Sequence, residues 1–518
     1  MTAGKNKFGR RAFMSAALTA AAGAGVAGDA AAQAAPAQGG AAARRRASNP
    51  GLYRVEADVR DCEVEGKIPS DLDGAFYRVG PDPQYPLRPG NIPFDGEGHV
   101  SMFRFRNGRV DYRSRYVKND RYTAQAKAGR LLFPMYRNPA LDDPGVKGLS
   151  RSTANTHIIN HKNLLLALKE DSPPAALDLL TLETVAHNYT FDGQLPSQTF
   201  TAHPKVDSET GDIVAFGYEA KGLGSDDISI FQITPQGKIV WNAWVKAPYV
   251  GMLHDFAVTQ KYIVLYAIPL AFDAKQMQAG GIHWSWDATL PTYFGVLRRG
   301  GDGKDVRWIK GPTRSSTHVM GAFSDGDKVY VDCEMSKSNP FPFMPMRDGA
   351  SWDPVNGASR IVRLSADLSK KKTSGYNIEE MYPEYLGALP RQDDRYNTMP
   401  YRYGFLGSPD PSADPAKKGN ASYVRFDHQT RKTSVFNAGP NTTLAECCFA
   451  PRRKDAPEGD GYLMGVATRH DEGGRADLVI LDAQHLQDGP VATVKLPIRA
   501  VGQIHGWFVP GAQLPSGG

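Results

Sequence analysis

The amino-acid sequence predicts an all-β fold, and three observations support this prediction. From about residue 50 onward, short strand patterns alternate with turn signals rich in Gly, Pro, Asn and Asp. Helical periodicity is weak, so at most short helices are expected, near residues 121–132 and 378–385. Histidine also recurs in the same frame of three consecutive β units, which indicates radial repetition.

The clearest local element is a β-hairpin near the start of the predicted domain. Residues 100–105 and 109–117 flank Asn107-Gly108, and both turn positions tolerate the positive φ that a tight hairpin needs. A second pair of strand patterns flanks Thr234-Pro235-Gln236-Gly237 in the same way. Further strand patterns lie at residues 213–216, 228–233, 238–241, 263–266, 329–331, 462–466, 478–481 and 491–496.

The histidine frame predicts which all-β fold these units form. His203, His254 and His318 each precede a strand pattern of their unit by nine to eleven residues. If one unit spans about 60–65 residues, the gap between His318 and His505 holds about three units, and the chain holds about seven. The inner strands of a propeller converge on one axis, where histidines distant in sequence can meet. We therefore expect a seven-bladed β-propeller whose loops and short helices cap a metal site on the axis.

Composition argues against several other classes of protein. The chain has 518 residues, of which 41% are hydrophobic and 22% charged, as in ordinary globular proteins. Part of the net charge of +6 lies at the N-terminus, and no basic stripe interleaved with aromatic residues supports nucleic-acid binding. No stretch after the N-terminal segment is long and apolar enough to span a bilayer. The four cysteines include no CxxC pattern and neither require nor exclude a disulfide.

The first 48 residues are predicted to be an export signal followed by a linker. Arg10-Arg11-Ala12-Phe13 resembles a twin-arginine signal, ahead of an Ala-rich apolar run and the small-residue site Ala32-Gln33-Ala34. We expect residues 1–34 to direct the protein to the periplasm and residues 35–48 to be flexible. Residues 49–518 then form a single propeller domain. The alternative for the N-terminus is a disordered Ala-rich tail.

Four of the twelve histidines, His203, His254, His318 and His505, are candidate metal ligands. Each lies at the edge of a strand pattern in the repeated frame, whereas other histidines such as His283 lie outside it. Structural zinc sites more often contain thiolates, and catalytic zinc sites usually keep three protein ligands. Imidazole also suits iron, copper and nickel. The residues alone therefore predict a divalent metal that is either redox-capable or zinc-like.

Distinctive motifs extend over nearly all of residues 50–510. They are Phe76-Tyr77-Arg78-Val79-Gly80-Pro81-Asp82-Pro83, Phe94-Asp95-Gly96-Glu97-Gly98, Ala154-Asn155-Thr156, Thr201-Ala202-His203-Pro204-Lys205, Leu253-His254-Asp255-Phe256 and Ile504-His505-Gly506. Together they resemble the carotenoid cleavage oxygenase family. The resemblance implies a seven-bladed propeller with one Fe(2+) per chain, held by the four histidines named above. It further implies an oxidoreductase, a dioxygenase that adds O₂ across an alkene and yields two aldehydes.

The same resemblance assigns hydrogen-bond acceptors to the histidine rings. Metal-bound histidines normally donate their second ring N–H to an acceptor, and in this family three glutamates accept these bonds. Glu170 and Glu446 match two of the three. The third position falls at Ala388, which has no acceptor for its expected partner, His318. A water or Glu384 is then expected to substitute, or the iron to bind more weakly.

Within the family, the chain is most similar to the lignostilbene dioxygenase branch, which cleaves the central double bond of 4-hydroxystilbenes or related phenylpropenes. Tyr136 and Lys169 match the pair that hydrogen-bonds the substrate phenol, and Phe94 matches an aromatic residue that packs against the substrate ring. A nearby ammonium favours phenolate over phenol, and phenolate can push electrons towards the alkene. Neighbours on a regular strand point to opposite faces, so Lys169 and Glu170 can both face the cavity only if a bulge or strand end re-aims one of them.

Three other functions remain open from the sequence. Apocarotenoid cleavage on the same scaffold requires a long apolar tunnel and an apolar patch that docks on membranes. A non-catalytic periplasmic propeller that binds a ligand or partner leaves the four histidines scattered and free of metal. An isomerohydrolase shares the scaffold, but Tyr136 and Lys169 argue against it. The expected partners are a small aromatic alkene and O₂, without stable membrane insertion.

Overall fold

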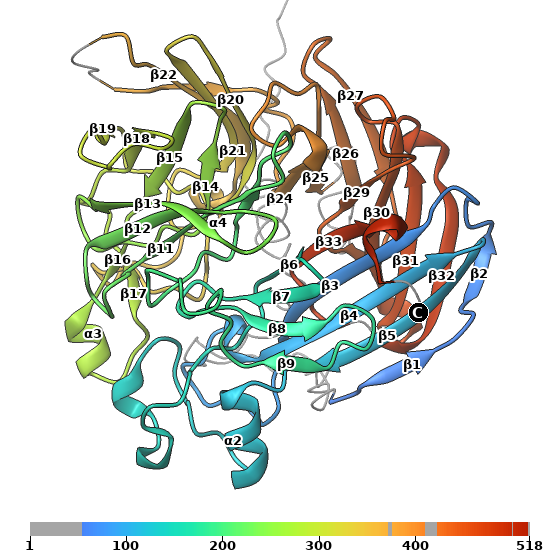
Figure 1. Ribbon diagram of the computed structural model, residues 1–518, viewed down its shortest axis with the longest axis horizontal. Coiled ribbons are helices and arrows are strands. Elements are labelled where there is room, and N and C mark those ends of the chain that lie inside the picture. Colours follow the sequence, from blue (N-terminus) through green and yellow to red (C-terminus); the bar gives the residue numbers. More distant parts are fainter. Residues whose placement is uncertain (1–53, 371–374, 410–421, 500, 516–518) are drawn as a thin grey trace, which may run out of the picture.

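Seven antiparallel sheets surround a common axis in the computed structural model of the protein, and each sheet forms one blade of a β-propeller (Figure 1). The structure describes residues 54–370, 375–409, 422–499 and 501–515. The prediction of an all-β, seven-bladed fold is confirmed. The predicted signal peptide (1–34) and linker (35–48) lie outside the described residues.

Five blades have four strands each, which follow one another from the axis outward in chain order. The first two comprise β6 (His157–His161), β7 (Leu164–Leu168), β8 (Ala175–Asp178) and β9 (Thr184–Ala186), then β10 (Lys205–Val206), β11 (Ile213–Tyr218), β12 (Asp227–Ile233) and β13 (Ile239–Lys246). The next two comprise β14 (Phe256–Val258), β15 (Tyr262–Ala267), β18 (Tyr293–Arg298) and β19 (Arg307–Lys310), then β20 (Val319–Asp325), β21 (Lys328–Met335), β22 (Arg360–Asp367) and β23 (Asn377–Glu380). The fifth comprises β24 (Ala388–Gln392), β25 (Tyr403–Ser408), β26 (Ser422–Asp427) and β27 (Lys432–Asn437).

The two remaining blades close the ring, because each combines strands from both ends of the chain. One contains β1 (Ala57–Val59), β5 (Arg109–Tyr116), β4 (Glu97–Arg106), β3 (Gly74–Asp82) and β33 (His505–Pro510). The other contains β2 (Glu63–Gly66), β32 (Pro490–Arg499), β31 (Arg475–Asp482), β30 (Gly461–Arg469), β28 (Thr442–Leu444) and β29 (Cys448–Pro451). The pairing of β33 with β3 places His505 opposite Val79, on the inner edge of its blade.

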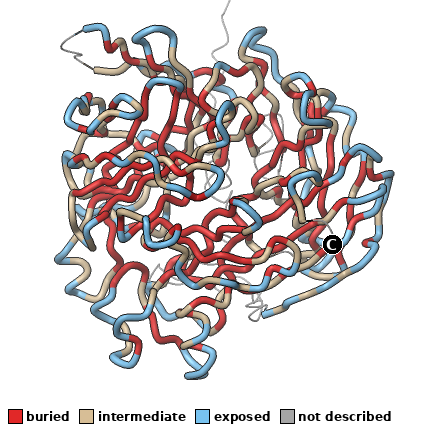
Figure 2. Tube along the Cα trace, viewed as in Figure 1, coloured by how far each residue is buried: buried red, intermediate tan, exposed pale blue. Residues whose placement is uncertain are grey.

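Apolar side chains fill the spaces between neighbouring blades. Every residue of β11 and β15 is buried, because adjacent blades cover both faces of these strands. The outer strand β13 instead alternates between half-buried and exposed residues over its first half, as a strand with one solvated face does. Figure 2 shows this gradient, with buried chain in the blade interiors and exposed chain at the peripheral loops.

The predicted hairpins are confirmed, and their turns have the expected backbone conformation. Asn107 and Gly108 join β4 to β5 with φ of 54° and 71°, so both occupy the left-handed region that this two-residue turn requires. The turn that contains Gly237 joins β12 to β13, and Gly237 has φ of 82°.

Helices contribute little to the described structure. The α-helices of the described residues are α2 (Asp120–Ala128), α3 (Ala274–Gln278) and α4 (Pro354–Gly357), beside several three-residue 3-10 helices, and a two-stranded sheet of β16 (Leu270–Phe272) and β17 (Trp284–Trp286) lies near α3. The helix expected over residues 121–132 is present but stops at Ala128, because Gly129 takes a left-handed conformation and its N–H bonds back to Gln125. None of the helices in the described ranges has the length and apolar character needed to cross a bilayer.

The helix predicted over residues 378–385 is wrong. The segment begins as the edge strand β23, which pairs with β22 and places Ile378 opposite Leu364 against the core. Its consecutive glutamates suit a helix, but the exposed edge of β22 offers backbone hydrogen bonds that a strand satisfies. Tyr382 and Tyr385 then turn inward and pack in a separate cluster.

Candidate metal centre and its two pockets

Four imidazole rings meet on the propeller axis. His203, His254 and His318 lie one or two residues before the inner strands β10, β14 and β20, and His505 begins β33. One nitrogen of each ring lies within 4.8 Å of those of the others. The Nε2 atoms of His203 and His254 are 3.1 Å apart, and those of His254 and His318 are 3.2 Å apart. The fold thus brings all four predicted ligands to one point.

Buried glutamates hold two of these rings as the resemblance implied. His254 Nδ1 donates to Glu170 Oε2 at 3.0 Å, and His505 Nδ1 donates to Glu446 Oε1 at 2.8 Å. The backbone N–H of Gly506 also donates to Glu446, at 2.9 Å. A ring that donates through Nδ1 has the tautomer whose Nε2 lone pair is free for a metal.

His318 also has a carboxylate partner, so the expectation built on Ala388 is wrong. His318 Nδ1 donates to Glu334 Oε1 at 2.8 Å, and the backbone N–H of Leu389 donates to Glu334 Oε2 at 3.0 Å. Neither a water nor Glu384 is needed, because β21 of the same blade supplies the acceptor. Ala388 lies beside it in the wall of a pocket.

The electrostatics of the centre favour neutral rings at His203 and His505 and an ionised carboxylate at Glu446. Burial lowers the pKa of His505 to about 4. Burial and the neighbouring imidazoles hold the pKa of His203 well below its ordinary value. Burial alone would raise the pKa of Glu446, but His505 and Arg391 bring it down to about 2. For His318, burial lowers the pKa, but Glu334 outweighs it and the pKa is raised.

These residues fit a divalent transition metal. Among the described residues, the buried Nε2 of His505 has no hydrogen-bond partner, which is costly unless another group occupies the axis. Four imidazole nitrogens oriented by three carboxylates are a set that holds such an ion. His203, His254, His318 and His505 would be its ligands.

Asp255 connects three of the segments that bear these histidines. Its Oδ1 accepts from Lys205 Nζ at 2.7 Å, two residues after His203. Its Oδ2 accepts from the backbone N–H of Val319 at 2.8 Å, directly after His318. Since Asp255 itself follows His254, one carboxylate fixes the starts of β10, β14 and β20 relative to one another. The sequence prediction quoted this residue within a motif but gave it no role.

An apolar pocket reaches the centre from one side. Phe94, Tyr136 and Lys169 all line it, as do His254, His318 and His505. Lys169 Nζ lies 5.8 Å from the centroid of the Phe94 ring and 5.1 Å from that of Tyr136. Phe341 and Phe343, which the sequence prediction missed, pack edge-on against Phe94 with centroid separations of 6.1 and 5.2 Å. The predicted phenol-binding residues are therefore adjacent to one another and share a pocket with the histidines.

The end of a strand lets Lys169 and Glu170 face the same pocket. The strand β7 ends at Leu168, so the alternation of a regular strand does not extend to either residue. Lys169 Nζ donates to Thr156 Oγ1 at 3.3 Å, while Glu170 bonds to His254. The loop that carries Phe94 is fixed by Asn155, whose side chain donates to the Phe94 carbonyl at 2.9 Å.

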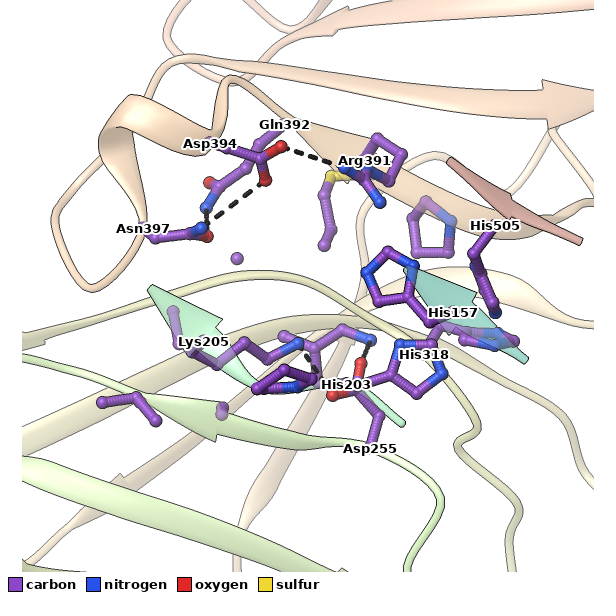
Figure 3. A pocket seen from close by; sticks show the side chains of 18 of the residues that line it. His157, His203, Lys205, Asp255, His318, Arg391, Gln392, Asp394, Asn397 and His505 are labelled. Atoms are coloured by element: carbon purple, nitrogen blue, oxygen red, sulfur yellow. Dashed lines mark hydrogen bonds and ion pairs between the residues drawn. The ribbon is translucent and has the colours of Figure 1, made fainter. Parts of the chain in front are cut away.

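A second, polar pocket reaches the centre from the other side (Figure 3). Figure 3 shows His203, His318 and His505 at its inner end, with Gln392, Asp394 and Asn397 across the cavity. His157 also lines it and packs against two of the four rings, with centroids 5.4 Å from His203 and 5.2 Å from His505. The sequence prediction did not select His157, although the distinctive motif Ala154-Asn155-Thr156 directly precedes it.

Comparison with known proteins agrees with this arrangement. A family model described as retinal pigment epithelial membrane protein matches residues 51–510. The chain belongs to this family, the carotenoid cleavage oxygenases. Its sequence is 40% identical over 477 residues to lignostilbene-alpha,beta-dioxygenase isozyme III of Sphingomonas paucimobilis, covering 89% of this chain and 96% of that protein. It is 39% identical over 465 residues to isoeugenol monooxygenase of Pseudomonas nitroreducens, covering 88% of this chain and 96% of that protein.

A solved structure of the family has the same fold. The crystal structure of Pseudomonas brassicacearum lignostilbene dioxygenase superposes with a TM-score of 0.85 at 41% identity, covering 89% of this chain and 97% of that one. The resemblance drawn from the motifs is therefore confirmed for both the family and the propeller.

Proposed function

We propose that this protein is an Fe(2+)-dependent dioxygenase that cleaves the central double bond of a 4-hydroxystilbene or a related phenylpropene with O₂. One alkene and one O₂ give two aldehydes, so no other reactant is required. When bound by the four histidines, Fe(2+) supplies the redox chemistry that O₂ needs to react with the alkene. Support comes from relatives named as lignostilbene dioxygenases and from the residues around the centre.

One apolar pocket is lined both by His254, His318 and His505 and by Lys169 and Tyr136, the pair proposed to recognise a phenol. This shared pocket is the observation that carries the proposal. The buried ammonium of Lys169 favours the phenolate form of a substrate hydroxyl. Burial, assisted by Glu170, raises the pKa of Tyr136 well above its ordinary value, so its hydroxyl stays protonated and can donate to the same oxygen. Phe94, with Phe341 and Phe343, stacks against the substrate ring and aligns the alkene.

A phenylpropene is the second candidate substrate. The relative named isoeugenol monooxygenase supports it at nearly the same identity as the lignostilbene enzyme. Lys169 and Tyr136 recognise a phenol in either class, so the two substrates differ in what fills the rest of the pocket. Apocarotenoid cleavage is a third possibility, and it does not use an ammonium.

The test uses protein from about Ala35 onward, loaded anaerobically with Fe(2+) and exposed to O₂ with one substrate at a time. A 4-hydroxystilbene, its 4-methyl ether, isoeugenol and an apocarotenal are compared, and the aldehydes are identified by mass spectrometry. Cleavage confined to the free phenols is expected. Cleavage of the methyl ether at the same rate would remove the roles of Lys169 and Tyr136, and cleavage of the apocarotenal alone would replace the substrate class.

We also propose that residues 1–34 export the folded protein to the periplasm through the twin-arginine route. Arg10-Arg11 followed by an apolar run supports this. Fusing residues 1–48 to a reporter that fluoresces when exported folded tests it. Replacing Arg10 and Arg11 with lysine should then keep the reporter in the cytoplasm, and unchanged export would contradict the proposal.

A further inference from the structure

The metal centre separates the two pockets, and the histidines divide between them. His254 lines only the apolar pocket and His203 lines only the polar one, whereas His318 and His505 line both. A divalent ion that enters the folded protein must therefore cross one pocket or the other.

The apolar pocket opposes the passage of a cation. Phe94, Phe341 and Phe343 offer no oxygen or nitrogen that could replace the water around an ion, and moving a charge into such surroundings is costly. Glu170 and Glu334 also line this pocket, but each already accepts a hydrogen bond from a histidine of the centre. The Lys169 ammonium adds repulsion, because within the described ranges no carboxylate forms an ion pair with it and its hydrogen bond goes to Thr156.

The polar pocket offers a route of the opposite character. Its two cations are each neutralised by a carboxylate: Lys205 pairs with Asp255 at 2.7 Å and Arg391 with Asp394 at 2.9 Å. Glu446, 3.7 Å from Arg391, adds a further negative charge near the histidines. The carboxylates of the polar pocket thus neutralise its lysine and its arginine, so its wall does not repel a divalent cation.

Unsatisfied polar atoms line the same walls. The buried Gln392 Oε1 and Thr398 Oγ1 have no hydrogen-bond partner within the described part of the chain. Oxygens of this kind readily replace water around a divalent cation. Further in, the buried Nδ1 of His157 is also without a partner, and this ring lies against His203 and His505. The polar pocket therefore offers two unpaired oxygens, those of Gln392 and Thr398, and an imidazole, that of His157, directly beside the four histidines.

We propose that the polar pocket is the route by which a divalent metal reaches the four histidines, with Gln392, Thr398 and His157 as its transient ligands. The apolar pocket is then reserved for the organic substrate. This inference rests on the proposed function only in that the four histidines bind a metal.

The experiment follows the uptake of Co²⁺ by folded, metal-free protein in a stopped-flow instrument, through the visible absorption of the bound ion. Asn397→Trp places a bulky side chain at the half-buried edge of the polar pocket, next to Gln392. Phe343→Trp, the matched control, adds bulk to the apolar pocket instead. We expect Asn397→Trp to slow uptake about tenfold or more, equivalent to a barrier higher by about 1.4 kcal/mol. Its final stoichiometry should stay at one ion per chain, and Phe343→Trp should load at the wild-type rate.

A second variant tests the ligands rather than the opening. Replacing Gln392 with Leu and Thr398 with Val removes both oxygens at nearly constant side-chain volume. We expect this double variant to take up Co²⁺ more slowly than the wild type, while the melting temperature of the metal-free protein is unchanged. Wild-type loading rates in this variant and in Asn397→Trp, or slow loading in Phe343→Trp, would overturn the route. Failure of the wild-type protein to bind Co²⁺ would instead overturn the metal centre and, with it, the proposed function.

Discussion

At the scale of single residues, the centre depends on acceptors placed behind the metal ligands. Glu170, Glu334 and Glu446 each accept from one imidazole Nδ1–H. The resemblance placed the third acceptor at Ala388, whereas in the structure the carboxylate that meets His318 comes from Glu334. A sequence signal did exist: Glu170 follows the second strand of its blade, and Glu334 is near the end of the second strand of its own. Extending the histidine frame to second strands would have identified it.

Replacing Lys169 with Met should lower kcat/KM for a 4-hydroxystilbene on the order of 100-fold, because the phenol then lacks its cation. The iron content should be unchanged, since Lys169 donates to Thr156 rather than to a histidine of the centre. Steady-state kinetics and metal analysis check both. Lys162→Met, at the exposed turn of the same hairpin, is the control, and an equal loss in both variants would contradict the role of Lys169.

Replacing Glu334 with Gln should weaken metal binding by about 10–100-fold, because His318 loses the carboxylate that orients its ring and raises its basicity. Competition with a chelator measures the dissociation constant. Ala388→Glu should not improve the affinity of the wild-type protein, since Glu334 already occupies the acceptor position. Tighter binding in Ala388→Glu would show that the His318 partner is inadequate.

At the scale of elements, residues at or beside the ends of strands build most of the metal centre and its apolar pocket. Lys169 and Glu170 reach one pocket because β7 ends before them, and the four histidines lie at or just before inner strands. Asp255 then ties three of these strand starts together. The edges of strands matter as well. Residues 378–385 do not form the predicted helix, because pairing with the open edge of β22 outweighs the local helical preference of the segment.

We expect the stability of the folded protein to depend on pH through His428, at the hairpin of β26 and β27. His428 directly follows β26 in the turn of this hairpin and is bonded through Nδ1 to the Tyr382 hydroxyl at 3.0 Å, and burial lowers the pKa of His428 to about 4. In the unfolded chain, His428 takes up a proton near pH 6.5, whereas in the folded protein it does so only near pH 4. The stability that neutral His428 contributes is therefore present above pH 6.5 and lost as the pH falls towards 4, at about 1.4 kcal/mol per pKa unit.

Urea unfolding of metal-free protein between pH 7 and 4.5 measures this effect. His428→Gln should lose less stability than the wild type over this range, because Gln does not titrate. Parallel curves for the two proteins would exclude His428 as the source. His470→Gln, an exposed histidine, should follow the wild type.

At the scale of the whole molecule, the centre joins four different blades. The four histidines come from the blades that contain β10, β14, β20 and β33, and β33 is also the strand that closes the ring against β3. An ion held by these histidines would therefore connect the closing strand to three others across the propeller.

Metal should raise the melting temperature of the wild-type protein. A ligand present at about 100 times its dissociation constant stabilises the folded state by about 2.7 kcal/mol. His505→Ala should abolish most of this gain, because it removes the ligand on the closing strand. Differential scanning calorimetry with and without Co²⁺ tests this, and His485→Ala, an exposed histidine, should keep the full increase. An increase retained in His505→Ala would remove His505 from the centre.

The all-β class, the hairpin turns and the four histidines could be predicted from the sequence, because strand alternation, Asn-Gly turns and a repeated frame are local or periodic signals. Its motifs also pointed to the family, and to Phe94, Tyr136, Lys169, Glu170 and Glu446. The carboxylate that meets His318, the end of β7 before Lys169 and the place of His157 beside a polar pocket became known from the three-dimensional fold. These features depend on how strands pair and pack in three dimensions: Glu334 meets His318 within one blade, and His157 lies against rings from two other blades. No local pattern encodes the distance between two such side chains.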